Sequence, residues 1–163
     1  MIIYLLRHGI AEDYSPQGDA GRSLTDDGVA KLERAAAGWK RIVGEVDLML
    51  VSPLLRAQQT AAIFCEAVAA SAPCVETAAL IPEARPLLAL ELLHAAMHEG
   101  KRGVACVGHE PNLGALLGLL LTGSERAAIP FKKGMLAVAD VESSSAMTGR
   151  LVAALSQRLA AEY

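Results

Sequence analysis

The stretch MIIYLLRHG, residues 1–9, decides the fold. Its residues 2–6 form an unbroken apolar run, which is typical of a strand covered on both faces of a parallel sheet. Such a strand usually ends in a turn residue, whereas this one runs directly into Arg7, His8 and Gly9. We therefore expect a buried strand whose carboxyl end carries chemically active side chains.

The rest of the chain alternates between similar strands and helices. Thr25 is a good N-cap, and apolar residues recur at helical spacing from Val29 to Val43. The segment 150–155 (RLVAAL) fits a strand or a helix on pattern alone. The pattern predicts strands at residues 2–6, 46–52, 74–80, 103–108 and 135–141, and helices at 25–43, 53–70, 87–100 and 111–123.

Strands that alternate with helices predict a layered α/β domain with a mainly parallel central sheet and helices on both faces. The length of 163 residues suits a single domain, residues 1–163, with a real core. The last two apolar segments, 135–141 and 150–155, are joined by a polar loop. They could form an antiparallel hairpin at the edge of the sheet.

Composition excludes several classes of protein. The net charge of −3 argues against a nucleic-acid partner, and Lys132-Lys133 is interpreted as solvated surface. The longest apolar stretch is about half as long as a membrane span requires. Cys65, Cys74 and Cys106 are odd in number and form no C-x-x-C pair, which favours a reducing cytoplasm over a disulfide framework.

Charged side chains follow three of the predicted strands. The first strand is followed by Arg7 and His8, the second by Arg56, and the strand at residues 103–108 by His109. Ligands of open α/β sheets bind beyond the carboxyl ends of the strands, so we expect these four side chains in one cleft. Such a cationic pocket suits a phosphoryl group, because its oxygens match the planar fork of arginine.

Two imidazoles can divide the work of phosphoryl transfer. One neutral ring can attack phosphorus through a nitrogen, while the other donates to an equatorial oxygen. Gly9 would let the backbone approach the phosphate closely. Ser52 is interpreted as the N-cap of the helix that begins at Pro53, in a position close to the same phosphate.

The site has no visible metal ligands. No carboxylate cluster that could hold magnesium accompanies the two histidines. His94 and His98 have a spacing that can bind zinc, but no further ligands accompany them, and we interpret them as part of a polar helix face. We therefore expect no metal and no cofactor.

Four segments together resemble a known family. In chain order they are LLRHGIAED (5–13), RSLTDDG (22–28), VSPLLRAQQTA (51–61) and VGHEPNL (107–113). The combination resembles the histidine phosphatase superfamily, which includes the phosphoglycerate-mutase-like enzymes. Within that superfamily, the chain is most similar to the small bacterial phosphohistidine phosphatases.

The resemblance carries implications for both fold and mechanism. It implies a phosphoglycerate-mutase-like three-layer sandwich with a minimal cap, in which residues 150–155 form a strand. It also implies a covalent phosphohistidine intermediate on His8. Arg7, Arg56 and His109 are then expected to bind the phosphoryl group.

Two further roles have alternatives. Arg22 matches a family position near the mouth of the pocket, or it ties down the loop before Thr25. The general acid is Glu83, where larger relatives carry a carboxylate, or Glu110, directly after the second histidine. Alternatively no acid is needed, because imidazole has an ordinary pKa of about 6.5 and leaves phosphorus as a neutral ring when its other nitrogen is protonated. We put Glu83 forward.

The sequence thus predicts a metal-independent phosphatase that acts on phosphohistidine in a phosphotransfer or signalling protein. Only residues 14–22 and 80–86 are long enough to form a lid, and an open pocket suits a protein side chain. The alternatives are a broad small-molecule phosphomonoesterase and a phosphate-binding module without catalysis. We expect a monomer or a weak dimer.

Overall fold

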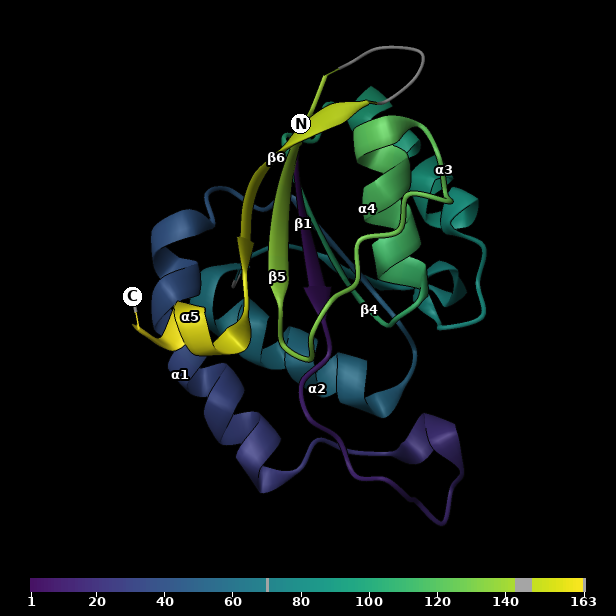
Figure 1. The fold of residues 1–163 in the computed structure, drawn as a ribbon. Coiled ribbons are helices and arrows are strands. Elements are labelled where there is room, and N and C mark those ends of the chain that lie inside the picture. The colour runs from purple at the N-terminus through teal and green to yellow at the C-terminus, as the bar shows by residue number, and fades with distance from the viewer. Residues whose placement is uncertain (70, 143–147, 163) are drawn as a thin grey trace.

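The computed structural model describes residues 1–69, 71–142 and 148–162. Within these residues, six strands form one sheet: β1 (Ile2–Arg7), β2 (Leu48–Val51), β3 (Cys74–Glu76), β4 (Gly103–Gly108), β5 (Leu136–Val141) and β6 (Gly149–Leu155). Their order is β3-β2-β4-β1-β5-β6. The first four in this order are parallel, whereas β5 is antiparallel to both of its neighbours (Figure 1).

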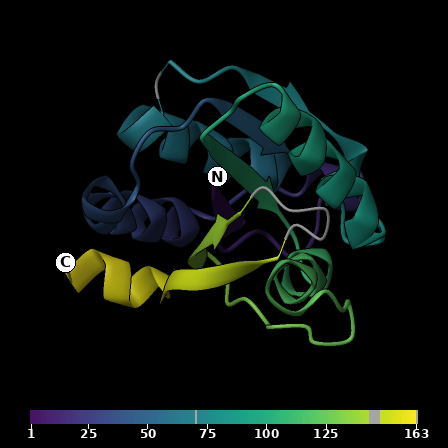
Figure 2. The same cartoon turned by 90° about the horizontal axis from the view of Figure 1, so that it is seen from above.

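Helices cover both faces of the sheet, so the predicted three-layer α/β sandwich is confirmed (Figure 2). One face is covered by α1 (Asp26–Ile42), α2 (Leu55–Phe64) and α5 (Gln157–Glu162), and the other by α3 (Pro86–His98) and α4 (Asn112–Thr122). Shorter turns are the 3-10 segments η1 (Asp19–Gly21) and η3 (Ala78–Leu80), and the π-helical segment η2 (Cys65–Ala69), which extends α2.

The alternation of side chains along β1 builds both halves of the core. Ile3 and Leu5 pack with the helices α3 and α4, whereas Tyr4 and Leu6 pack with α1 and α2. Strand β4 is buried at every position. A strand covered on both faces needs apolar residues at consecutive positions, which explains the unbroken runs in the sequence.

The start of α2 corrects the prediction for Ser52. The helix begins at Leu55 and its N-cap position is Leu54, without a side-chain cap, so Ser52 is not the N-cap. The Ser52 hydroxyl accepts only a long hydrogen bond, of 3.4 Å, from the Leu54 N–H. Residues 53 and 54 form a bend before the helix. Ala70, the predicted end of the helix, lies outside the described residues.

The segment 74–80 is a strand only over its first three residues. The hydroxyl of Thr77 then accepts a hydrogen bond of 3.1 Å from the Ala79 N–H and starts the 3-10 turn η3. Threonine hydroxyls compete with strand pairing for nearby N–H groups in this way. The next helix, α3, begins at Pro86, one residue before its predicted start.

The C-terminal segment resolves an open alternative. Residues 150–155 belong to strand β6, antiparallel to β5, as the family resemblance implied. The polar loop expected before it falls largely on residues 143–147, outside the described residues. Helix α5 was not predicted, and it packs on α1 where Gly38 has no side chain to block the Ala160 carbonyl.

No helix in the described ranges has the length and hydropathy to cross a membrane.

Candidate active site

Sheet order brings the three predicted strand ends together. Strands β2, β4 and β1 are neighbours. Backbone hydrogen bonds to β4 also continue one residue past the ends of β1 and β2. The His8 N–H donates to the Gly108 carbonyl at 3.1 Å, and the Ser52 N–H donates to the Val107 carbonyl at 3.0 Å. The residues that follow the three strands therefore share one edge of the sheet.

The two imidazoles of this edge lie side by side. His8 is 5% exposed and His109 is 1% exposed. Their ring centroids are 4.8 Å apart and the ring planes are inclined by 47°. At this separation both rings can touch one tetrahedral group of the size of a phosphoryl.

The backbone fixes the tautomer of His8. Its Nδ1 lies 2.7 Å from the Gly9 carbonyl oxygen, which can only accept a hydrogen bond, so Nδ1 carries the proton. In the neutral ring the lone pair is then on Nε2. The pKa of His8 is lowered to about 4, mainly by burial and also by the charges of Arg56 and Arg7. The ring is consequently neutral and nucleophilic near pH 7.

His109 is held by Ser52. Its Nε2 lies 2.9 Å from the Ser52 hydroxyl, whereas its buried Nδ1 has no hydrogen-bond partner among the described residues. Burial, followed by the neighbouring His8 and Arg56, lowers the pKa of His109 to about 3. In the neutral ring, a Ser52 hydroxyl that donates to Nε2 leaves the Nδ1 proton as the donor for another acceptor.

Both arginines have part of their guanidinium engaged by protein oxygens. Arg56 is 4% exposed and donates to the carbonyl and the carboxylate of Asp19 at 2.8 and 2.9 Å. Arg7 donates to the Phe131 carbonyl. The Nε atoms of both are buried and lack a partner in the described part of the chain. Buried N–H groups without acceptors are rare, and here they belong to the side chains expected to bind an anion.

Arg22 reaches the site only through Asp19. Its guanidinium donates to the Glu12 carbonyl at 2.6 Å and to the Asp19 carboxylate at 2.8 Å. Asp19 thus bridges Arg22 and Arg56, and the hydrogen bond from Arg56 is the main cause of its lowered pKa. These contacts match the loop-tying alternative for Arg22, and its contact with a substrate stays a prediction.

Gly9 is closely packed. A Cβ at this position would lie 2.7 Å from Cδ1 of Leu32, so a larger residue would require the Leu32 side chain to shift. The Gly9 N–H donates to the Thr60 hydroxyl at 3.1 Å, and that hydroxyl donates to the Arg56 carbonyl at 2.7 Å. The proposed approach of Gly9 to phosphate stays a prediction.

Two residues of this arrangement had no clear signal in the sequence. Thr60 lies within a predicted helix, and only its position one turn after Arg56 connects it to the site. Asp19 lies in a polar loop, and nothing in the sequence connects it to Arg56, which is 37 residues away. Both act through contacts that only the folded chain creates.

The two candidate acids occupy different surroundings. Glu83 is exposed, on the loop between η3 and α3, and this loop is held by the Asn112 amide, which donates to the Ala84 carbonyl at 2.8 Å. Glu110 instead accepts the Phe131 N–H at 2.9 Å. The carboxylate of Glu110 is therefore engaged in holding the loop before β5, whereas that of Glu83 faces solvent.

The described residues contain no cluster of three or more side chains suited to hold a metal ion. The rings of His94 and His98 are 6.5 Å apart on α3. Such a pair alone does not complete the tetrahedral ligand set that zinc requires. The expectation of a metal-free reaction stays a prediction.

Comparison with known proteins identifies the family. A profile described as histidine phosphatase superfamily (branch 1) matches residues 3–83. One relative is 33% identical over 128 residues, which cover 76% of each protein. The chain therefore belongs to the histidine phosphatase superfamily, as predicted, and is a phosphatase by class. The relative is the phosphohistidine phosphatase SixA of Escherichia coli (strain K12).

Solved structures agree with this assignment. A structure of the protein histidine phosphatase SixA complexed with tungstate has a TM-score of 0.88 and 25% identity, and the match covers 97% of this chain and 98% of that one. The α-ribazole phosphatase of Shigella flexneri has a TM-score of 0.73 at 17% identity, with 96% and 97% covered. At 17% identity, the second match shows the fold alone.

Proposed function

We propose that the protein removes phosphate from phosphohistidine on another protein, with His8 as the nucleophile. The observation that carries the proposal is the buried pair His8 and His109, 4.8 Å apart, beside the Arg56 guanidinium. The similarity to the phosphohistidine phosphatase SixA supports the substrate class. A similar protein also binds tungstate, a tetrahedral oxyanion of phosphate-like shape.

The reaction proceeds in two steps. In the first, the Nε2 lone pair of His8 attacks phosphorus and the bond from phosphorus to the substrate imidazole breaks. In the second, water attacks phosphorus, the bond to Nε2 breaks, and phosphate is released. Throughout, the Gly9 carbonyl holds the Nδ1 proton of His8 and keeps the ring oriented.

The surrounding donors stabilise the transferred group. The Nδ1 proton of His109 and the N–H groups of Arg7 and Arg56 are directed to the phosphoryl oxygens, where charge is highest in the transition state. Ser52 orients His109 from the opposite ring nitrogen. Asp19 places the Arg56 guanidinium and lowers the cost of burying its charge.

The leaving group decides how much acid assistance is required. A substrate imidazole protonated on its other nitrogen leaves as a neutral ring, so the first step needs little help. We favour Glu83 as the proton donor because it is exposed, whereas Oε1 of Glu110 accepts the Phe131 N–H. Glu83 is therefore proposed as an auxiliary acid that matters most for poorer leaving groups.

A comparison of substrates tests the proposal. Release of inorganic phosphate is measured from a phosphohistidine-bearing protein, from sugar phosphates and from a phosphoserine peptide. We expect kcat/KM to be highest for the phosphohistidine protein. A clear preference for sugar phosphates would instead assign the site to small-molecule phosphomonoesters, and no release from any of them would leave a phosphate-binding module. A cytoplasmic location and a monomeric or weakly dimeric state stay predictions.

A further inference from the structure

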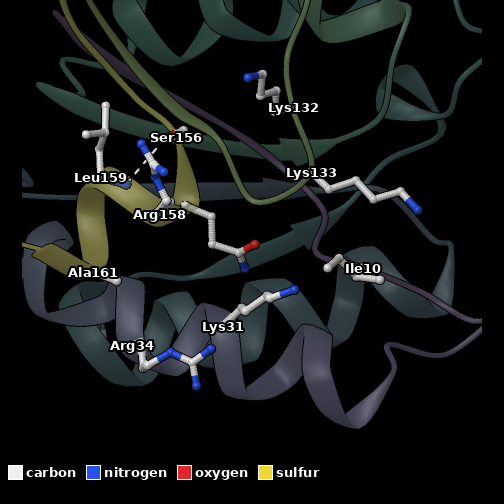
Figure 3. Close-up of a pocket in the computed structure, with 10 residues that line it drawn as sticks. Ile10, Lys31, Arg34, Lys132, Lys133, Ser156, Arg158, Leu159 and Ala161 are labelled. Atoms are coloured by element: carbon white, nitrogen blue, oxygen red, sulfur yellow. Dashed lines mark hydrogen bonds between the residues drawn. The ribbon is translucent and has the colours of Figure 1, made fainter.

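An open groove of about 920 Å³ lies between α1, the loop before β5 and α5 (Figure 3). Lys31 and Arg34 come from α1, Lys132 and Lys133 from the loop, and Arg158 from α5. No carboxylate lines this groove in the described ranges, although the whole chain has a net charge of −3. The groove is therefore a local cationic surface on an acidic protein.

Most of this positive charge is available to a partner. Lys31 forms an ion pair with Asp27 of the same helix, at 2.6 Å, and Arg158 lies 3.9 Å from the Glu162 carboxylate. The other three cations of the groove form no ion pair within the part of the chain that the structure describes. Because both ion pairs are exposed, Lys31 and Arg158 can exchange their present carboxylate for one of a partner at little cost in free energy.

A buried amide adds a second, independent feature. Gln157 lines the groove and is 9% exposed, and its Nε2 has no hydrogen-bond partner among the described residues. Its amide carbon lies 2.7 Å from where a Cβ of Gly134 would be, so it abuts the loop that carries the lysines. A buried N–H without an acceptor is costly, and an incoming carboxylate oxygen would satisfy it once the amide turns toward the groove.

The loop that carries Lys132 and Lys133 is bound to the segment that carries the proposed nucleophile. The Gly134 N–H donates to the carbonyl oxygens of Arg7 and His8 at 3.1 and 3.0 Å. Ile10, two residues after His8, lines the groove. After burial, the charge of Lys133 is one of the causes of the lowered pKa of His8. The groove therefore lies beside the segment of chain that carries His8.

Building on the proposed function, we propose that this groove docks an acidic segment of the phosphohistidine protein. Asp and Glu side chains of that segment pair with Arg34, Lys132 and Arg158 while the phosphohistidine enters the site. Exposed cations on long side chains act mainly by steering and selecting a partner. A nucleic acid is the poorer occupant, since the net charge of −3 repels an extended polyanion outside the groove.

Two peptides of equal length test the proposal, each with one phosphohistidine, flanked either by Asp and Glu or by Asn and Gln. For the unaltered protein we expect kcat/KM to be about tenfold higher on the acidic peptide at low ionic strength, and equal on both at high salt. Binding of the same peptides without phosphate is measured by fluorescence anisotropy, so that docking is tested apart from hydrolysis.

The key variant is Arg34→Gln/Lys132→Gln/Arg158→Gln, which spares Lys133 because its charge acts on His8. Its matched control, Lys40→Gln/Arg41→Gln/Arg126→Gln, removes the same charge from exposed positions outside the groove. We expect the key variant to lose the preference for the acidic peptide and to hydrolyse the neutral peptide within twofold of the unaltered rate. The control should keep the preference.

Three results would overturn the docking proposal: no preference in the unaltered protein, a preference that survives in the key variant, or equal loss in the control. An oligonucleotide and polyglutamate are also compared as competitors for binding of the acidic peptide. Stronger competition by the oligonucleotide would overturn the choice of an acidic protein segment as the occupant. Failure of the proposed function has a different signature, in which the acidic peptide binds better but neither phosphopeptide releases phosphate.

Discussion

His8 and His109 share one environment but differ in the ring nitrogen that the protein engages. Both are buried among positive charges and are neutral at pH 7. The Gly9 carbonyl engages Nδ1 of His8, whereas Ser52 engages Nε2 of His109. His8 is therefore left with a free lone pair on Nε2, as a nucleophile requires, and His109 keeps an N–H to donate when the Ser52 hydroxyl donates to its Nε2.

The lowered pKa values predict how stability depends on pH. In the unfolded chain both imidazoles titrate near 6.5, so between that value and about 4 the unfolded chain binds protons that the folded chain does not. The stabilisation is complete above pH 6.5 and is lost as the pH falls. In His109→Gln, the decrease in the free energy of unfolding from pH 7 to pH 4 should be smaller by on the order of 2 kcal/mol. Urea titrations at several pH values measure this, and parallel curves for the two proteins would contradict it.

Arg56 should not be replaceable by lysine. Its planar guanidinium donates to Asp19 with two nitrogens, and in the proposed mechanism its Nε donates to a phosphoryl oxygen, whereas an ammonium group cannot hold this geometry. We expect Arg56→Lys to lower kcat/KM by about 10² to 10³-fold. Asp19→Asn keeps the backbone carbonyl and one of the two side-chain acceptors, so its kcat/KM should fall at least tenfold less than that of Arg56→Lys. Similar losses in the two variants would mean that Arg56 only positions the loop.

At the scale of elements, the site depends on a contact between the end of β1 and the first turns of α2. The Thr60 hydroxyl accepts the Gly9 N–H and donates to the Arg56 carbonyl, and so connects the nucleophile segment to the helix that carries the arginine. Thr60 is completely buried, so its hydroxyl cannot be replaced by water without rearrangement.

Thr60→Val should therefore impair both stability and catalysis. The buried Gly9 N–H would lose its acceptor, at a cost of about 1 to 3 kcal/mol in the free energy of unfolding. Displacement of the strand end should lower kcat about tenfold. Thr60→Ser should restore kcat, and Thr122→Val, at the far end of α4, serves as the control. Equal kcat values in the Val and Ser variants would exclude the positioning role.

Elements were predictable where their patterns are strong. The unbroken apolar runs of β1 and β4 and the capped, periodic α1 lie within about one residue of their predicted bounds. The start of α2 was misplaced because Ser52-Pro53 has the composition of a helix start but forms a turn. Helix α5 was missed because it is short, although the Ser156 hydroxyl, which accepts the Leu159 N–H, was a usable signal.

At the scale of the whole molecule, the chain could be assigned to its fold because motifs and strands coincide. Three charged motifs each follow a strand, and parallel order then brings them to one edge of the sheet. The same reasoning does not find Asp19, Thr60 or the basic groove. They join segments distant in sequence, and Lys132 and Lys133 have the composition of ordinary surface.

The proposed mechanism relies on protein cations, so chelators should have no effect. Phosphate release after prolonged treatment with EDTA and phenanthroline should remain within the error of the untreated rate. If chelation abolished the activity and magnesium or zinc, but not calcium, restored it, the reaction would require a metal. The role given to Arg7 and Arg56 would then be wrong.

The central claim, transfer of phosphate to His8, is tested most directly by trapping the phosphoenzyme. The protein is mixed with a substrate carrying radioactive phosphohistidine, quenched in alkali within milliseconds, and digested for peptide mapping. We expect base-stable, acid-labile phosphate on the peptide that contains His8, and none in His8→Ala, which should release no phosphate. Label on a different residue, or undiminished turnover in His8→Ala, would contradict the account.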